Sequence, residues 1–182
     1  MEFDADLIAC AGIVERADTL RFRATMAAPL EARRVLFPLY AFNIEMARAP
    51  WVTQEAMIAE MRLQWWRDVC EEIAKGEPVR RHEVATPLAA AITADDARLL
   101  DGLVAARRWD VYRDPFEDAA HFDAYIDQTA GNLMWVAARR LGQADERTVR
   151  DAAYGAGVAA WLVAIPRLVE LGRVPLLDGT EE

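Results

Sequence analysis

Two pairs of aspartates are the first candidates for chemistry, because paired carboxylates can hold a divalent metal ion. Asp123 and Asp127 lie four residues apart, and so do Asp114 and Asp118, which places each pair on one face of a helix. Such a face could hold Mg²⁺. However, Asp114 is well placed to cap a helix at the following proline, with Asp118 in its first turn, and the chain has 30 acidic residues. We therefore interpret both pairs as solvated helix faces.

Nucleophilic and metal chemistry of other kinds is poorly supported. The sequence contains no serine, which excludes a Ser-His-Asp hydrolase built around His82 or His121. Cys10 and Cys70 lack CxxC or CxxH spacing, so we expect two reduced thiols rather than a zinc site, with Cys70 buried. The arginine doublets could clamp phosphates but are interpreted as surface ion pairs: Arg33-Arg34, Arg80-Arg81, Arg107-Arg108 and Arg139-Arg140.

Composition limits the classes of partner. The net charge of −9 disfavours binding to nucleic acid or to an anionic membrane. The longest uncharged run, residues 152–166, is shorter than the roughly 20 residues that span a bilayer, so we expect a buried helix and no transmembrane segment. The acidic first residues do not resemble a signal or transit peptide, and we expect a cytoplasmic protein.

Helical periodicity recurs along the whole chain, which predicts an all-α fold. We expect helices over residues 5–17, 30–49, 53–75, 93–112, 114–141 and 145–171, with 21–29 as a connector and 76–83 as a loop. Thr53 and Asp114 are predicted N-caps, while Pro38 and Pro166 should bend or break their helices. Met57, Met61, Trp65 and Val69 recur every fourth residue, and Ile58, Leu63, Trp66 and Ile73 widen this apolar face, which predicts a broad buried stripe.

Four segments, at residues 21–29, 40–51, 125–134 and 157–168, resemble in order the squalene and phytoene synthases. The resemblance implies an isoprenoid-synthase-like helical bundle that forms one domain over residues 1–182, with the C-terminal helices of the family absent. In those enzymes two aspartate-rich motifs hold Mg²⁺ against a prenyl diphosphate. Segment 40–51 reads like the first of these motifs and segment 157–168 like the second.

Neither segment keeps the metal-binding acids. The degenerate first motif comprises Tyr40, Phe42, Asn43, Glu45, Ala47, Arg48 and Trp51. The family's acids fall on Ala47, Arg48 and Trp51, and Leu168 replaces the leading aspartate of the second motif. Since Mg²⁺ requires oxygen ligands, we predict neither a metal site nor catalytic residues. Glu45 is expected to form an ion pair with Arg48 or Arg23, and binding of a polar group is its alternative role.

The resemblance also places a set of residues in the family's substrate cavity, where several polar positions have become apolar. These residues are Tyr125, Thr129, Gly131, Met134, Trp161, Ala164 and Leu168. Met134 replaces a glycine that leaves room for substrate in the enzymes. A large side chain should therefore fill part of the cavity.

Segments 41–47 (Ala-Phe-Asn-Ile-Glu-Met-Ala) and 62–67 (Arg-Leu-Gln-Trp-Trp-Arg) resemble a branch of phytoene-synthase-like complex I assembly factors. This implies a non-catalytic protein without a cofactor that contacts complex I subunits, in the cytoplasm or peripherally at the inner membrane. The absence of a transit peptide and the arginine-rich composition indicate a bacterial relative of that branch. Two alternatives remain open: an active head-to-head prenyltransferase that uses Mg²⁺, and a protein that binds an isoprenoid, a quinone or another lipid. We also expect a homodimer or a bound partner, with the last helix in the interface.

Overall fold

The computed structural model describes residues 4–53, 55–112 and 114–175, and every regular element in these ranges is helical. The helices are α1 (Ala5–Ala17), α2 (Thr19–Ala27), α3 (Leu30–Arg48), α4 (Ala56–Lys75), α5 (Ala85–Ala91), α6 (Ala94–Arg107), α7 (Trp109–Tyr112), α8 (Ala119–Ile126), α9 (Asn132–Leu141) and α10 (Glu146–Glu170). A π-helical segment, Asp127–Gly131, joins α8 to α9. The predicted all-α fold is confirmed.

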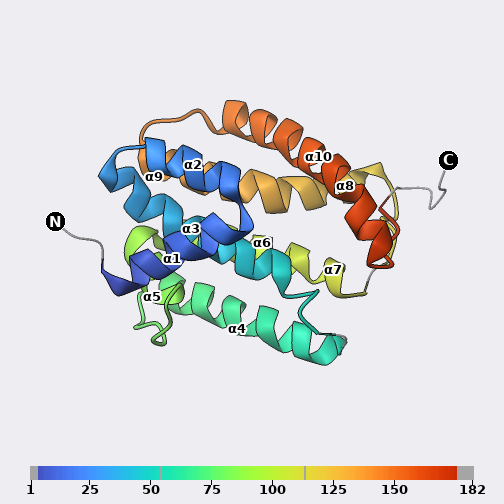
Figure 1. Ribbon diagram of the computed structural model, residues 1–182, viewed down its shortest axis with the longest axis horizontal. Coiled ribbons are helices and arrows are strands. Elements are labelled where there is room, and N and C mark those ends of the chain that lie inside the picture. The colour runs from blue at the N-terminus through green and yellow to red at the C-terminus, as the bar shows by residue number, and fades with distance from the viewer. Residues whose placement is uncertain (1–3, 54, 113, 176–182) are drawn as a thin grey trace.

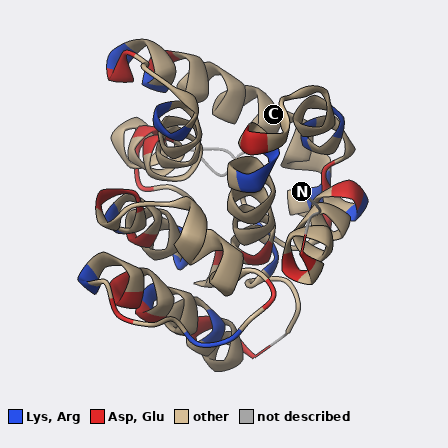
Figure 2. Cartoon of the chain, turned by 90° about the vertical axis from the view of Figure 1, so that its left-hand side faces the viewer, with Lys and Arg blue, Asp and Glu red and all other residues tan. Residues whose placement is uncertain are grey.

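The helices form a bundle in which α4 and α10 lie on opposite sides (Figure 1). Helix α4 packs on α6, α1 packs on α3, and α10 packs on the π-helical segment and α9. The main core lies between α1, α3, α4, α5, α6 and α9, and Phe37, Phe42, Leu63 and Leu100 are fully buried in it. Acidic and basic residues alternate along the helices, as the red and blue segments of the cartoon in Figure 2 show.

Several predicted helix ends are confirmed by their caps. Helix α6 begins with a capping box, in which the Thr93 hydroxyl accepts from the Asp96 N–H and the Asp96 carboxylate accepts from the Thr93 N–H. Gly76 ends α4 with φ = 72°, a left-handed conformation that glycine adopts at little cost. The side chain of Asp145 caps α10 by accepting from the Thr148 N–H.

The predicted connector at residues 21–29 is wrong, because α2 covers most of it. Asp18 explains the helix, since its side chain accepts from the Arg21 N–H at 3.0 Å and so caps the helix N-terminus. Thr53 is not an N-cap either. Its hydroxyl accepts from the Glu55 N–H within a turn, and α4 begins afterwards, at Ala56.

The predicted helix start at Asp114 is also wrong. Helix α8 begins at Ala119, and Asp118 is its N-cap because its carboxylate accepts from the His121 N–H at 2.8 Å. Pro38 and Pro166 do not break their helices, since α3 and α10 each continue through their proline.

The predicted buried stripe of α4 is only partly correct. Met57 and Met61 are 75% and 66% exposed and Trp65 is half-buried, whereas Val69 is buried. Leu63, Trp66 and Ile73, which widen the predicted stripe, are buried as expected, together with Ala59, Val69 and Cys70. Ile58 is 40% exposed. Both thiols are free and buried, and burial raises the pKa of Cys10 and of Cys70 to about 12.

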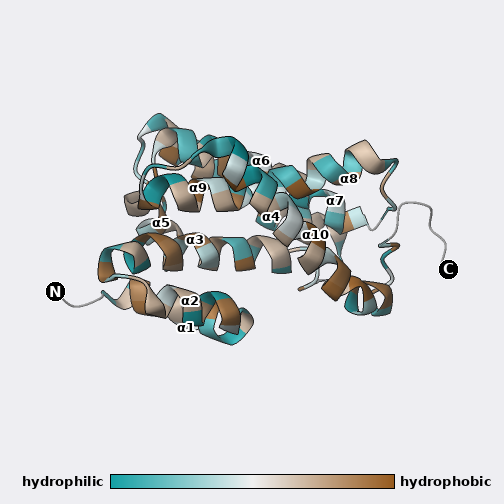
Figure 3. Ribbon diagram, turned by 90° about the horizontal axis from the view of Figure 1, so that it is seen from above, coloured by the Kyte–Doolittle hydropathy of each residue, from teal (hydrophilic) through white to brown (hydrophobic). Residues whose placement is uncertain are grey.

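Helix α10 departs most from expectation. Of its 25 residues, all of which the structure describes, Ala153 alone is buried, so the expected buried helix is wrong. Its outer face is apolar, with Leu162 57% and Val163 83% exposed, and hydrophobic residues occupy much of α10 in Figure 3. Among the described residues, α10 is also the one helix long and apolar enough to cross a membrane by length and composition alone. Core helices of other proteins meet the same two criteria.

Candidate functional site

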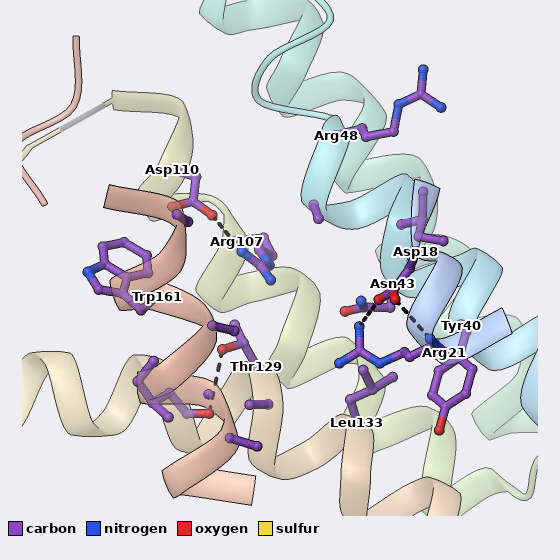
Figure 4. Close-up of a pocket in the computed structure, with 18 of the residues that line it drawn as sticks. Asp18, Arg21, Tyr40, Asn43, Arg48, Arg107, Asp110, Thr129, Leu133 and Trp161 are labelled. Atoms are coloured by element: carbon purple, nitrogen blue, oxygen red, sulfur yellow. Dashed lines mark hydrogen bonds and ion pairs between the residues drawn. The ribbon is translucent and has the colours of Figure 1, made fainter. Parts of the chain in front are cut away.

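A cavity of about 450 Å³ lies between α3, α6, the π-helical segment and α10 (Figure 4). Its volume is within the range of about 300–1,000 Å³ typical of small-molecule sites. It collects residues from segments far apart in the sequence, including those of both degenerate motifs. This cavity is the candidate functional site.

Helix α3 and the turn after it form one wall. Tyr40, Asn43, Ala47, Arg48 and Trp51 line the cavity there. The other two residues of the degenerate first motif do not. Phe42 is fully buried in the main core, and Glu45 lines a second, smaller hollow together with Arg62, Trp65, Trp66 and His82. The helical repeat explains this division, since side chains one or two positions apart point to different sides of a helix.

The opposite wall comes from α10, α8 and the π-helical segment. Tyr125, Thr129, Met134, Trp161, Ala164 and Leu168 line the cavity, as does Gly157. Gly131 is not among the lining residues and instead lies beside Asp127 and Arg150. A Cβ atom at Gly157 would lie 2.8 Å from the Ala130 Cβ and from the Ile126 Cγ2, so glycine permits α10 to approach the π-helical segment this closely.

The cavity does not fit Mg²⁺. Ala47, Arg48, Trp51, Ala164 and Leu168 present no oxygen ligand where the family would hold the metal, and Mg²⁺ binds through oxygen. Within the described ranges, no group of three or more His, Cys, Asp or Glu side chains is placed to hold a metal ion.

The aspartate pair considered from the sequence has structural partners. The Tyr154 hydroxyl donates to Asp123, and Arg150 donates to Asp127 at 2.8 Å. In the second pair, Asp114 and Asp118, the side chain of Asp118 caps the N-terminus of α8. These contacts account for Asp118, Asp123 and Asp127 without a metal.

A cluster of charged groups lies at one end of the cavity. Asp110 is 3% exposed and accepts from the Tyr125 hydroxyl at 2.8 Å and from Arg107 at 3.2 Å. Arg107 also donates to the Tyr125 oxygen at 2.7 Å. Arg173, which follows α10, lies 3.2 Å from the other Asp110 oxygen, and its side chain is fully buried. Burial is the largest cause that raises the pKa of Tyr125, so this phenol stays neutral.

Aromatic rings surround this charged cluster. Phe116 contacts Tyr125 and Trp161 edge to face, with ring centroids 5.3 and 5.4 Å apart. The Arg173 guanidinium lies 5.6 Å from the Phe116 ring and 5.4 Å from the Trp161 ring, within the range of cation–π attraction. Trp161 itself is half-buried and donates to the Pro175 carbonyl.

The opposite end of the cavity is a second polar region, shown to the right in Figure 4. Asp18 caps α2 and also forms an ion pair with Arg21 at 2.8 Å. The Arg21 guanidinium lies 5.4 Å from the ring of Tyr40. Small apolar side chains also line the cavity, among them Ala47, Ala130 and Ala160.

A family model described as squalene/phytoene synthase matches residues 14–171. The chain belongs to the squalene/phytoene synthase family. Residues of both segments that resemble the family's aspartate-rich motifs line the cavity described above. No solved structure matches the sequence significantly.

Curated relatives in this family carry the names of assembly factors. The chain is 29% identical over 170 residues to a fruit fly protein (Drosophila melanogaster) named NADH dehydrogenase (ubiquinone) complex I, assembly factor 6 homolog, covering 86% of this chain and 50% of that protein. It is 25% identical over 138 residues to human NADH dehydrogenase (ubiquinone) complex I, assembly factor 6, covering 75% of this chain and 41% of that protein. The chain thus spans about half the length of these relatives or less.

Sequence reasoning missed most of the charged cluster. Arg107 was interpreted as half of a surface doublet, and its neighbour Arg108 does form such an ion pair, with Glu60. The other pairings of the doublets include Arg80 with Glu72 and Arg81 with Asp6. Arg173 carried no local signal. A charged residue between aromatic residues, as in Trp109-Asp110-Val111-Tyr112, is the one hint that the sequence offers.

Proposed function

We propose that this chain is a non-catalytic factor in the assembly of respiratory complex I, acting through contacts with complex I subunits or their precursors. The observation that carries the proposal is the cavity wall, which has Ala47, Arg48, Trp51 and Leu168 at the positions of the family's metal-binding acids. Ionising a prenyl diphosphate needs metal ions that neutralise the departing charge. The names of the fly and human relatives supply the assembly role.

The outer face of α10 supports action through protein contacts. Gly155, Ala159, Leu162 and Val163 are exposed and uncharged on this helix. Proteins rarely leave apolar patches larger than a few hundred Å² uncovered. We place the partner on this face, a homodimer being the alternative occupant, and we place the protein in the cytoplasm of a bacterium, peripherally at the inner membrane.

Deletion of the gene in its own organism tests the assembly role. We expect less assembled complex I on native gels and a proportional loss of NADH oxidation by isolated membranes. The wild-type gene should restore both, whereas a Leu162→Glu/Val163→Glu variant should not. Leu20→Glu is the matched control, since Leu20 is also an exposed apolar residue, 80% exposed, but belongs to a different helix, α2. Normal complex I levels in the deletion strain would exclude the proposal.

The competing function, head-to-head prenyl transfer, has a separate test. The purified protein should release no pyrophosphate from farnesyl diphosphate with millimolar Mg²⁺. A ligand that binds the folded state at 100 times its Kd adds about 2.7 kcal/mol of stability, which a melting curve detects easily. Stabilisation of that size by Mg²⁺ with a diphosphate analogue would favour the enzyme.

Binding of an isoprenoid, a quinone or another lipid is a second candidate function, and the cavity itself favours it. The space of about 450 Å³ persists although both metal motifs are gone. Mass spectrometry of the protein purified under native conditions should then detect a co-purifying apolar compound. A protein purified from its own organism that carries none would count against this candidate.

A further inference from the structure

The charge of the cavity wall is opposite to that of the whole chain. The chain has a net charge of −9, yet Arg21, Arg48 and Arg107 line the cavity against two aspartates, Asp18 and Asp110. Arg173 adds a further positive charge directly behind Asp110. A positively charged cavity raises the local concentration of negatively charged ligands, even when the whole chain is negatively charged. The wall therefore attracts anions.

The excess positive charge is concentrated at Arg107. Asp18 forms an ion pair with Arg21 and caps the N-terminus of α2, so its negative charge does not neutralise the other arginines of the wall. Asp110 is the one carboxylate that the structure places against both Arg107 and Arg173, each at 3.2 Å. Because Tyr125 donates its hydroxyl hydrogen to Asp110 and stays neutral, two guanidinium groups share a single negative charge.

The charged cluster also lacks hydrogen-bond acceptors, just as it lacks negative charge. Within the part of the chain that the structure describes, the Arg107 Nε and all three side-chain nitrogens of Arg173 are buried without a hydrogen-bond partner. Buried donors without partners are unfavourable, and a buried cation without a counter-charge is more so. Arg107 lines the cavity, whereas Arg173 lies behind Asp110. An anion placed against Arg107 would add the counter-charge that the cluster lacks.

The rest of the cavity wall indicates which chemical group should carry the anion. From the Arg107 cluster, the wall along α10 and the π-helical segment continues through Ala130, Ala156, Gly157 and Ala160. Such a surface gains free energy by burying a hydrocarbon chain. It offers no carboxylates to hold the metal that a diphosphate would bring, and the local excess of positive charge is too small for a group with several negative charges.

We propose that the cavity binds a single-chain amphiphile, whose one anionic head group lies against Arg107 and whose hydrocarbon chain lies along α10. The proposal deepens the lipid-binding candidate and rests on it, and it is independent of the assembly role. A carboxylate and a phosphodiester each supply a head with one negative charge. The first would come from a free fatty acid and the second from a lysophospholipid.

A pair of probes that differ only in the head group tests the proposal. Myristate and 1-tetradecanol carry the same chain length, and Trp51 and Trp161 line the cavity, so tryptophan fluorescence and melting temperature report binding. We expect myristate to bind the wild-type protein roughly tenfold more tightly than the alcohol, or better, as charge-assisted hydrogen bonds predict. Comparing myristate with 1-myristoyl lysophosphatidylglycerol, whose phosphodiester carries one negative charge, then identifies which anionic head is preferred.

Variants locate the head group. Arg107→Gln should weaken myristate binding by roughly 10- to 100-fold and leave tetradecanol binding nearly unchanged. Arg98→Gln is the control, because Arg98 lies on the same helix, α6, with an exposed side chain paired to Asp95. Since Arg107 also holds Asp110 and Tyr125, Arg48→Gln provides a second variant at an exposed lining residue and should weaken myristate binding less.

The possible results test the anionic head group and lipid binding in the cavity separately. Equal affinities for myristate and tetradecanol would overturn the anionic head while leaving the lipid-binding candidate in place. Unchanged myristate binding in a folded Arg107→Gln variant would overturn the position of the head. Binding of neither probe to protein stripped of lipid would overturn the proposal together with the lipid-binding candidate.

Discussion

The two sides of the bundle are packed differently. On the side of α4 and α6, helices press against one another, and Leu63, Val69, Leu100 and Leu103 have no exposed surface. On the side of α10, a smaller cluster of Phe116, Tyr125 and Ile126 borders the cavity, and α10 buries one of its residues. The closely packed side of α4 and α6 stabilises the fold, because side chains that fill a core without voids contribute to the free energy of unfolding. The side of α10 leaves space and an uncovered face, which are what binding requires.

Truncating one tryptophan on each side is the strongest test of this difference. Trp66 is 5% exposed and contacts the Phe42 ring at 5.3 Å, so Trp66→Ala should lower the free energy of unfolding by about 3–5 kcal/mol. Trp161 is half-buried beside an existing cavity, so Trp161→Ala should cost clearly less. Urea denaturation of both variants gives the two values. Equal losses would mean that the α10 side is as tightly packed as the main core.

Asp96 tests how the packed side tolerates a buried charge. Its side chain has no exposed surface, closes the capping box of α6 and lies 3.0 Å from Arg139. Asp96→Ala removes charge-assisted hydrogen bonds and should lower the free energy of unfolding by about 1.5–3 kcal/mol, measured in urea. Asp95→Ala, one residue away and exposed, is the control. If the two substitutions cost the same, neither the capping box nor the buried ion pair of Asp96 contributes measurably to stability.

Two glycines of α10 probe the side with the cavity. A methyl group at Gly157 would meet Ala130 and Ile126 at 2.8 Å, so Gly157→Ala should cost about 1–3 kcal/mol of stability through overpacking. Gly155 has nothing within 4 Å of its added Cβ, so Gly155→Ala should instead stabilise by about 0.4–1 kcal/mol. Thermal melting measures both. A stabilising Gly157→Ala would show that α10 can move away from the π-helical segment at little cost.

Local signals in the sequence determined the helices whose ends carry caps. Helix α1 has the predicted bounds, Ala5–Ala17, and α10 ends within one residue of the prediction at both ends. These signals act over three or four residues, so no distant contact is needed to interpret them. Helix α2 was missed although Asp18 caps it, because its residues show no clear apolar face. Helix α5 was missed because it has seven residues, two turns at most.

The sequence alone also determined which family positions had lost their acids, since that comparison needs only the residues themselves. Which residues meet was decided by the tertiary structure. Helix α4 carries apolar residues on more than one side, and packing on α6 selected Leu63 and Trp66 while leaving Met57 exposed. Arg107 and Arg108 are adjacent and chemically identical, yet one reaches Asp110 and Tyr125 and the other reaches Glu60. The reason is physical: neighbouring side chains on a helix point about 100° apart, and what each meets depends on helices that arrive from elsewhere in the chain.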